Sequence, residues 1–261
     1  MRCCGLDVGS RTIKLVTSEG GVLDSTIVDT GANPLERCRD LLASRTFDRI
    51  MVTGYGRYLV TSALGGRTVS EIKAHAVGAR YLHPDCRTVI DIGGQDSKVV
   101  LLSDEGEVTR FEMNDRCAAG TGRFLEVMAN TLEVDIRDFG GLALAASSSV
   151  QINSLCTVFA ESEVVSLIAQ GAERSTIAGA LHGAIATRIS GMANRVGHRP
   201  RVILTGGCAL NGCLVKMIRE RLGTDTVAAS DPQIVGALGA ALLAGKESPA
   251  GICKPPGNSV S

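Results

Sequence analysis

The sequence predicts an α/β protein with two similar halves, and three observations support this prediction. A unit of strand, tight turn, strand, hairpin and strand occurs twice, at an offset of 84 residues. An apolar strand at 202–204 leads through two glycines into an amphipathic helical pattern. The length of 261 residues is enough for two subdomains, each with its own core.

The two copies of the repeated unit match at their chemically important positions. The first copy runs from Leu6 to 22 and the second from Ile90 to 108. In each copy an acidic residue ends the first strand and a glycine opens the turn, and a lysine follows on the second strand. Three pairs align: Asp7 with Asp91, Gly9 with Gly93, and Lys14 with Lys98.

The turn after each aspartate has the composition of a phosphate-binding loop. We expect Gly9, Gly93 and Gly94 to adopt positive φ and to let the backbone approach a ligand. N–H groups exposed in such a turn, including those near Ser10, form a concavity that binds anions. An aspartate at the end of the preceding strand is suited to hold hydrated Mg²⁺ or to orient an attacking water. A plain β-turn is the alternative for a single copy, but two copies favour the functional interpretation.

The glycine pair after strand 202–204 predicts a different nucleotide contact. Gly206 and Gly207 stand between this strand and the helical run 210–222, where a base and ribose can lie against the backbone. A plain strand-to-helix turn is the open alternative.

The last predicted helix, 233–244, is rich in glycine and alanine, which permits close packing. Asp231 is expected as its N-cap and Pro232 in its first turn. The tail beyond Lys246 is predicted to be disordered.

The chain contains 9 cysteines, an odd number at irregular spacing, which argues against a disulfide framework. Most are expected to fill the core as small hydrophobic residues. Cys117 differs because it lies in a glycine-containing loop ahead of a predicted helix. Cys156 differs because it lies at the start of the predicted helix 158–170, with Asn153, Ser154 and Thr157 as candidate N-caps. The first of these helices has one apolar face, formed by Phe124, Leu125, Met128 and Leu132.

The position of both cysteines before helices suits a nucleophile or a metal ligand. A thiolate there is stabilised by the partial positive charge of the helix N-terminus. The alternative is that each cysteine is a loop residue pointing inward. Two cysteines cannot supply the four thiolates that a 4Fe–4S cluster usually takes, but a symmetric dimer doubles the number.

The composition excludes several classes of partner. Lys and Arg number 27 and Asp and Glu number 27, so nothing indicates a polyanion-binding surface, and nucleic acid is not expected as a partner. The chain shows no apolar run that could span a membrane and no signal peptide, so a cytoplasmic location is expected. The 4 histidines show no metal-site spacing and are expected at the surface or in caps.

Four of these segments resemble the motifs of a known superfamily. They are similar, in the same order, to the phosphate-1, phosphate-2, adenosine and connecting motifs of the acetate kinase, sugar kinase, Hsp70 and actin superfamily. The resemblance implies a duplicated actin/hexokinase-like (ribonuclease H-like) fold of two subdomains, with ATP and Mg²⁺ in a cleft. It places the first subdomain at 1–86, and the chain returns to this subdomain at 230–261. The second subdomain is expected at 87–229 and contains Cys117 and Cys156. The matching segments are Asp7–Ser10, Asp91–Asp96, Thr205–Gly207 and Gly236–Ala241.

A narrower resemblance covers roughly residues 5–244. The segments 114–124 and 156–164, together with 53–57 and 91–98, look like the activator of 2-hydroxyacyl-CoA dehydratases and the ATPase subunits of benzoyl-CoA reductase. The resemblance implies an ATPase of anaerobic metabolism. It also implies a homodimer with one 4Fe–4S cluster at its interface, held by Cys117 and Cys156 of both chains. ATP hydrolysis would deliver a low-potential electron to an iron–sulfur dehydratase or reductase. A ferredoxin or flavodoxin is the implied electron donor.

The resemblance also implies roles for individual residues. Asp7, Asp91 and Gln95 are the expected catalytic residues. Lys14 is expected to neutralise phosphate charge, although it and Lys98 are alternatively solvated strand residues. The residues expected to contact the nucleotide are Gly9, Ser10, Lys14, Gly93, Gly94, Gly120, Thr121, Gly122, Gly206 and Gly207.

Three other functions stay open at this point. A small-molecule kinase of the same superfamily would need an acceptor pocket with a general base, and no segment of the sequence stands out as one. A nucleotide-binding regulator without electron transfer would not need the two cysteines. A stable benzoyl-CoA reductase subunit would share every motif. The pairs Cys3/Cys4 and Cys208/Cys213 lie outside the family pattern and are expected to serve in packing.

Overall fold

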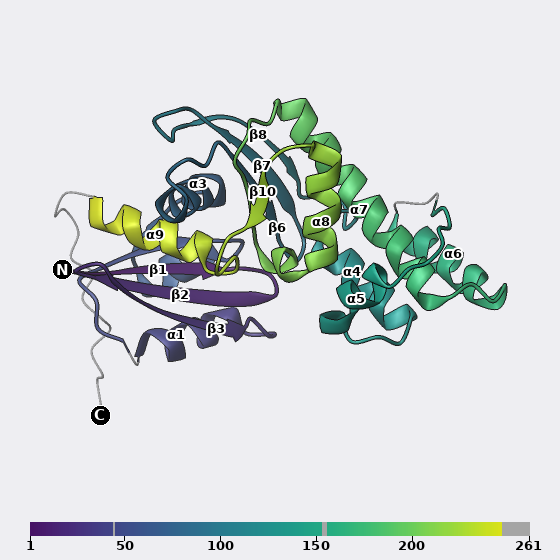
Figure 1. Ribbon diagram of the computed structural model, residues 1–261. Coiled ribbons are helices and arrows are strands. Elements are labelled where there is room, and N and C mark those ends of the chain that lie inside the picture. Colours follow the sequence, from purple (N-terminus) through teal and green to yellow (C-terminus); the bar gives the residue numbers. More distant parts are fainter. Residues whose placement is uncertain (44, 153–155, 247–261) are drawn as a thin grey trace. The chain divides into compact units, whose positions relative to one another are not determined.

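The computed structural model describes residues 1–43, 45–152 and 156–246 (Figure 1). The chain divides into two units, Met1–Pro84 with Gln233–Ser261, and Asp85–Pro232. These are called unit 1 and unit 2 below. The tail predicted to be disordered lies outside the described residues. Within the described ranges, no helix has the length and hydropathy needed to cross a membrane.

Unit 1 contains one five-stranded sheet in the order β3-β2-β1-β4-β5. The first three strands are antiparallel, whereas β4 runs parallel to β1 and β5 runs parallel to β4. Gly20 and Gly21, both at positive φ, form the two-residue turn between β2 and β3. The strands are β1 (Arg2–Val8), β2 (Thr12–Glu19), β3 (Val22–Asp29), β4 (Arg49–Thr53) and β5 (Arg67–Thr68).

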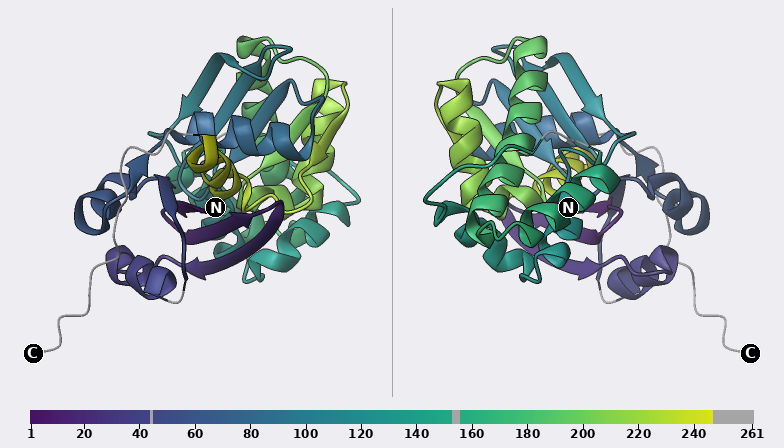
Figure 2. Two further views of the ribbon diagram at one scale, coloured as in Figure 1. Left: turned by 90° about the vertical axis from the view of Figure 1, so that its left-hand side faces the viewer. Right: turned by 90° about the vertical axis from the view of Figure 1, so that its right-hand side faces the viewer.

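Helices cover both faces of this sheet (Figures 1 and 2). Because side chains alternate along a strand, Leu6 faces one pair of helices while Cys3 faces the other side. Leu6 packs in a core with Cys38 of α1 and Val60 of α2. Cys3 packs with Ala240 of α9. The helices of unit 1 are α1 (Pro34–Ala43), α2 (Arg57–Leu64), α3 (Glu71–Leu82) and α9 (Val235–Lys246).

Helix α9 packs closely against α3 because its glycines leave no room for a side chain. A Cβ added to Gly239 would lie 1.8 Å from the carbonyl oxygen of Ala74 in α3. The helix begins at Val235, so the prediction of Asp231 as its N-cap and of Pro232 in its first turn is wrong. Both residues precede the helix, and the carbonyl of Pro232 instead accepts a hydrogen bond from the N–H of Gly206 in unit 2 (2.8 Å).

Replacing Gly239 by alanine is expected to destabilise the protein by about 3 kcal/mol or more, since the new methyl group would force α3 and α9 apart. Gly245→Ala in the same helix is the matched control. Its Cβ would meet only the Cys3 Sγ, at an ordinary 3.5 Å. Urea unfolding monitored by circular dichroism measures both variants. Equal stabilities would contradict the close packing of these helices.

Unit 2 repeats the strand connectivity of unit 1. Its sheet has the order β10-β9-β6-β7-β8, in which β6, β7 and β8 are antiparallel and β6, β9 and β10 are parallel. This confirms the predicted duplicated fold at the level of sheet topology. The strands are β6 (Thr88–Ile92), β7 (Ser97–Leu102), β8 (Val108–Asn114), β9 (Val202–Thr205) and β10 (Thr226–Ala228).

One hydrophobic core joins the sheet of unit 2 to its helices. The four apolar residues predicted to form one face of the helix after Cys117 are all buried there. The long helix α7 runs from the sheet toward α5 and α6 (Figure 1). The helices are α4 (Gly122–Thr131), α5 (Ile136–Leu144), α6 (Thr157–Ala169), α7 (Arg174–Val196) and α8 (Gly212–Leu222), with a 3₁₀ turn η1 (Gly207–Leu210).

The start of α6 differs in detail from the sequence prediction. Cys156 itself is the N-cap residue, and its carbonyl accepts a hydrogen bond from the N–H of Ala160 (2.8 Å). Thr157 is the first residue of the helix and is therefore not its cap. The other two predicted caps, Asn153 and Ser154, lie outside the described residues.

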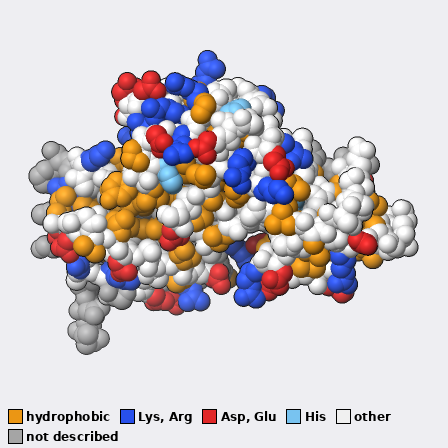
Figure 3. Space-filling view, viewed as in Figure 1, with side chains coloured by type: hydrophobic (Ala, Val, Ile, Leu, Met, Phe, Trp, Pro, Cys, Tyr) orange, Lys and Arg blue, Asp and Glu red, His pale blue; other side chains and the backbone are white. Residues whose placement is uncertain are grey.

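Charged side chains of both signs are interspersed on the face of the molecule shown in Figure 3. No large cluster of basic residues stands out on that face. This agrees with the balanced composition, in which 27 basic residues match 27 acidic ones.

Candidate functional site

The repeated aspartate and lysine face each other across adjacent strands in both units. Asp7 pairs with Lys14 in the register of β1 and β2, and Asp91 pairs with Lys98 in the register of β6 and β7. In each pair the lysine Nζ lies 3.4 Å from the aspartate Oδ2. Both aspartates are buried, as is Lys98, and the side chain of Lys14 is only 15% exposed. The alternative of a solvated strand residue is therefore wrong for Lys98, whereas Lys14 remains partly exposed.

The turn after each aspartate is closed by a backbone hydrogen bond from its glycine. The N–H of Gly9 donates to Thr12 (3.1 Å), and the N–H of Gly93 donates to Asp96 (2.9 Å). The predicted positive φ is wrong for Gly9, Gly93 and Gly94, which are not among the residues at positive φ. The need for glycine is steric at two of these positions. A Cβ on Gly9 would lie 2.8 Å from the Thr12 oxygen, and one on Gly93 would lie 2.8 Å from the Asp96 Oδ1.

A third element of the repeat was missed by the sequence analysis. Thr53 ends β4 in unit 1 and is followed by Gly54, just as Thr205 ends β9 in unit 2 and is followed by Gly206. Each of these strands is the parallel neighbour of an aspartate-bearing strand. Both glycines have positive φ, +91° and +83°. A Cβ on Gly54 would lie 2.5 Å from the Asp7 Oδ1, and one on Gly206 would lie 2.6 Å from the Asp91 Oδ1. The signal was present in the sequence, as an apolar strand followed by Thr-Gly in each half.

The two threonines differ in their partners. The hydroxyl of Thr205 donates to the Asp91 Oδ1 (3.1 Å). The hydroxyl of Thr53 is buried and has no hydrogen-bond partner among the described residues. The carboxylate of Asp91 is also contacted by the Nζ of Lys98, at 3.4 Å. The same Nζ lies 2.7 Å from the carboxylate of Asp96. The orientation of Asp91 is thus fixed by at least two neighbours.

The predicted adenosine loop packs directly on the turn after Asp91. Cys208, in η1, has its Sγ 4.0 Å from the carbonyl oxygen of Gly93. Burial raises the pKa of Cys208 to about 12, so its thiol stays protonated at neutral pH. Gly207 begins η1, and Gly206 precedes it as the N-cap.

The residues at the start of α4 join the same turn. The N–H of Gly122 donates to Gly93 and that of Arg123 to Gly94, each at 2.8 Å. The N–H and the hydroxyl of Thr121 both donate to Ala118, at 3.0 and 2.7 Å. Thr121 and Gly122, two residues predicted to contact the nucleotide, therefore have their N–H groups bonded within the protein.

Exposure separates Cys117 and Cys156 from the other described cysteines. Cys117 is partly exposed and Cys156 is exposed, whereas the other six are buried. Burial raises the pKa of Cys4 to about 12 and that of Cys38 to about 11, and it also raises the pKa of Cys213. Buried protonated thiols fill the core, as expected for Cys3, Cys4, Cys208 and Cys213. Cys253 lies outside the described residues.

Both accessible thiols precede helices that pack on each other. Cys117 lies in the loop before α4, and Cys156 caps α6. The hydroxyl of Thr131 in α4 lies 3.4 Å from the Glu161 carboxylate in α6. The chemistry of these residues, two accessible thiols without disulfide partners, one in the loop before a helix and one at a helix start, fits thiolate ligands of iron.

Comparison with known proteins assigns this arrangement to a family. Residues 4–244 match the BadF/BadG/BcrA/BcrD ATPase family. The chain belongs to this family. The match covers the strands, both repeated turns and the segments that carry the two accessible cysteines, and it confirms the predicted ATPase class.

Individual members of the ATPase family are similar over almost their whole length. The activator of lactoyl-CoA dehydratase from Anaerotignum propionicum is 42% identical over 254 residues, which are 94% of this chain and 97% of that protein. The crystal structure of the (R)-2-hydroxyglutaryl-CoA dehydratase component A from Acidaminococcus fermentans has a TM-score of 0.88 at 39% identity, covering 94% and 97% of the two chains. The activator of the 2-hydroxyisocaproyl-CoA dehydratase from Clostridium difficile, solved with bound ADPNP, has a TM-score of 0.85 at 38% identity, covering 94% of each.

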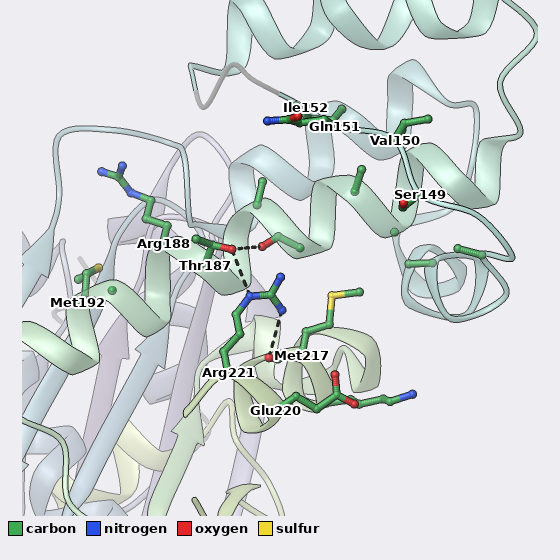
Figure 4. Close-up of a pocket in the computed structure, with 18 of the residues that line it drawn as sticks. Ser149, Val150, Gln151, Ile152, Thr187, Arg188, Met192, Met217, Glu220 and Arg221 are labelled. Atoms are coloured by element: carbon green, nitrogen blue, oxygen red, sulfur yellow. Dashed lines mark hydrogen bonds between the residues drawn. The ribbon is translucent and has the colours of Figure 1, made fainter. Parts of the chain in front are cut away.

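A groove of about 1030 Å³ lies elsewhere in unit 2, along the outer side of α7 (Figure 4). One wall is formed by the loop 146–152 and another by α8. Arg221 reaches from α8 to α7, where its Nε donates to the Thr187 hydroxyl (3.1 Å). Among the described lining residues there is no predicted nucleotide ligand, so the groove is separate from the repeated turns.

Two histidines are buried, contrary to the expectation of surface or capping positions. His75 is 5% exposed and His182 is fully buried. The Nδ1 of His182 lies 2.8 Å from the Ala178 carbonyl oxygen, and its Nε2 lies 2.9 Å from the Asn211 Nδ2. The Asn211 Oδ1 in turn caps α8 by accepting from the N–H of Leu214 (3.1 Å). A neutral His182 that donates through Nδ1 satisfies all these contacts.

Lowering the pH is expected to destabilise unit 2 through His182. Burial lowers the pKa of His182 below its usual 6.5, so below pH 6.5 the unfolded chain takes up a proton that the folded one does not. The contribution to stability falls by up to about 1.4 kcal/mol per pH unit until the folded pKa is reached. Urea unfolding between pH 8 and 5 should show a smaller pH dependence in His182→Gln than in wild type or in the control His198→Gln. The same slope in all three proteins would contradict this.

Proposed function

We propose that this protein is an ATP-dependent activator that delivers a low-potential electron to a 2-hydroxyacyl-CoA dehydratase-type partner. The observation that supports this proposal most directly is the exposure of two thiols. Cys117 and Cys156 are accessible, whereas the other described cysteines are buried. Both lie in the unit that contains the turn Gly93-Gly94. Relatives similar over 94% or more of this chain are dehydratase activators or components, which supports the same role here.

ATP with Mg²⁺ is the proposed nucleotide. ADPNP is bound in a similar activator, and the turns that carry Asp7 and Asp91 are built alike in the two units. Carboxylates at strand ends are suited to bind Mg²⁺ through its waters and to orient the attacking water. Backbone N–H groups around Ser10 and Gly94 bind phosphate oxygens. Gly206-Gly207 lines the adenosine.

Two polar residues next to these turns complete the proposed hydrolytic site. Gln95 follows Gly94 at an exposed position of the turn, where its amide can orient the water. Lys14 lies 3.4 Å from Asp7 and is partly exposed, so its charge is available to a phosphate. Lys98 is 2% exposed and is held between Asp91 and Asp96, which assigns it to positioning Asp91.

The proposed redox group is a 4Fe–4S cluster with Cys117 and Cys156 as ligands. Such a cluster, when bound, supplies a single electron at low potential. Each chain offers two accessible thiols among its described residues, and the cluster needs four thiolates, so the proposal requires a homodimer.

The surface of α6 supports a homodimer. Four apolar side chains on this helix are between 42% and 68% exposed, beginning two residues after Cys156. An exposed apolar patch beside a ligand that must be shared is suited to a self-complementary interface. The four residues are Val158, Phe159, Val165 and Ile168.

The proposed coupling between ATP and electron delivery is a difference in affinity. ATP can favour the electron-donating conformation only if it binds that conformation more tightly than the resting one. The electron donor is proposed to be a ferredoxin or flavodoxin, and the acceptor an iron–sulfur dehydratase component. A transient complex is expected with a dehydratase, whereas stable co-purification with other subunits would indicate a benzoyl-CoA reductase-type subunit.

The proposal is tested by reconstitution. The anaerobic, reduced protein is mixed with a dehydratase component from a related system, its acyl-CoA substrate and Mg·ATP. Dehydration should begin only when both ATP and the reduced protein are present, and ADP should accumulate. Phosphorylation of a small metabolite by an iron-free protein would instead support the kinase. Full activation by a Cys117→Ser variant would favour a regulator without electron transfer.

A further inference from the structure

The loop that carries Cys117 is held by the side chain of one buried asparagine. Asn114, the last residue of β8, is 8% exposed. Its Nδ2 donates to the carbonyl of Cys117 (2.8 Å) and to that of Ala119 (2.9 Å). Both amide hydrogens are therefore used to fix the backbone on either side of Ala118.

An arginine from α7 holds the same loop from the other side. The Nη2 of Arg188 lies 3.4 Å from the Asn114 Oδ1. The stem of Arg188 lies over Gly120, where a Cβ would be 3.0 Å from the arginine Cδ. In Figure 4 Arg188 extends from α7 on the side away from Arg221. The Nε of Arg188 is buried without a hydrogen-bond partner among the described residues.

The far end of the loop is tied to the phosphate turn. Gly122 and Arg123, at the start of α4, donate their backbone N–H groups to the carbonyls of Gly93 and Gly94. The loop 115–121 is thus held in its middle by the side chain of Asn114, and it leads directly into the helix start that is bonded to the turn after Asp91. Two backbone hydrogen bonds therefore connect this turn to the helix start that directly follows the seven-residue segment with Cys117.

We infer that Asn114 and Arg188 are positioning residues that clamp the Cys117 loop and make the exposure of its thiol respond to nucleotide at the Gly93-Gly94 turn. The inference rests on the function proposed above and adds two residues to it. Neither residue touches the nucleotide. Their role is to hold the Cys117 loop in one conformation relative to the Gly93-Gly94 turn. Without them, nucleotide binding at this turn should no longer change the exposure of the Cys117 thiol.

Asn114→Asp is the sharpest test, because the side chain of aspartate has the shape of the asparagine side chain but carries no N–H group. It turns two hydrogen bonds to carbonyls into two repulsive contacts while it retains an oxygen for Arg188. A role in packing alone predicts that this variant resembles wild type. A clamp predicts that the loop opens.

The readout is the rate at which a maleimide modifies Cys117 in iron-free protein, measured by peptide mass spectrometry with and without Mg·ADPNP. In wild type the rate should change on addition of the nucleotide. In Asn114→Asp the rate without nucleotide should rise about tenfold or more, and the nucleotide should no longer change it. Modification of Cys156 in the same sample, and the melting temperature, report whether the fold is intact.

Arg195→Gln is the matched control. Arg195 lies on the same helix as Arg188 and pairs with Glu112 on the same strand as Asn114, with its Nη2 2.6 Å from the carboxylate. This variant should retain the wild-type rate and its response to nucleotide. Arg188→Gln should raise the rate in the same direction as Asn114→Asp.

Two results would overturn the inference. One is a wild-type modification rate in Asn114→Asp, and the other is a wild-type rate that does not respond to nucleotide although a fluorescent ATP analogue binds. Because the measurement uses iron-free protein, it does not depend on the cluster. If the iron-binding proposal is wrong, the anaerobic protein will contain no iron. If the nucleotide proposal is wrong, the fluorescent ATP analogue will not bind.

Discussion

Replacing Cys117 or Cys156 by alanine is expected to lower the iron content of anaerobically purified protein from about two atoms per chain to nearly none. Each substitution would remove two of the four thiolates from the cluster proposed to be shared by a dimer, because both chains carry the change. The brown colour and the EPR signal of the reduced protein should disappear together with the iron. Iron is counted colorimetrically against protein concentration from amino-acid analysis.

Cys213→Ala is the matched control for these two variants. Cys213 lies in the same unit but is buried in α8, where it packs in the core. This variant should retain its iron, although the cavity left behind destabilises the fold somewhat. Iron and colour that persist in both the Cys117 and the Cys156 variant would show that these thiols do not hold the cluster.

The second large effect is expected from Asp91→Asn, which should slow ATP hydrolysis about 10²–10³-fold. The amide retains an oxygen for the Thr205 hydroxyl, but it removes the negative charge proposed to bind Mg²⁺ and to orient the water. Asp7→Asn should slow hydrolysis in the same direction, since Asp7 occupies the equivalent place in unit 1. Steady-state ADP release at saturating Mg·ATP measures the effect.

Asp104→Asn provides the control for a change of charge. Asp104 lies in the turn between β7 and β8, where its carboxylate pairs with Arg87 (2.9 Å) and is 65% exposed. Its removal should leave the hydrolysis rate within about a factor of two, because exposed ion pairs contribute little. A wild-type rate in both Asp91→Asn and Asp7→Asn would contradict the assignment of these carboxylates.

The part of the fold that the sequence predicted correctly is the part governed by short-range patterns. The alignment of Asp7 with Asp91 is preserved in the sheet register, where each aspartate faces a lysine. The apolar face after Cys117 and the helix after Cys156 were likewise readable from periodicity. The special status of these two cysteines followed from their place before helices, and their exposure agrees with it.

Other features depend on contacts between segments far apart in sequence, and these were predicted incorrectly or missed. The steric limit on Gly206 arises in part from Asp91, which is 115 residues away in the sequence. The contact between Asn114 and Arg188 had no signal in the sequence, because these residues are 74 positions apart and meet only through the packing of α7.

The start of α9 illustrates a competition between local and tertiary preferences. Asp231 and Pro232 form a favourable N-terminal sequence for a helix. The chain instead bonds the Pro232 carbonyl to the N–H of Gly206, and the helix begins at Val235. The hydrogen bond to a positive-φ glycine after β9 thus prevails over a local capping preference.

The most direct test of the account is to count iron and determine the molecular mass of one oxygen-free preparation that has been shown to bind ATP. The account predicts a brown protein with about two irons per chain, a particle of twice the chain's mass, and an EPR signal that changes when ATP replaces ADP. A colourless monomer that still binds ATP would contradict it and would leave the protein as an ATPase without an electron to deliver.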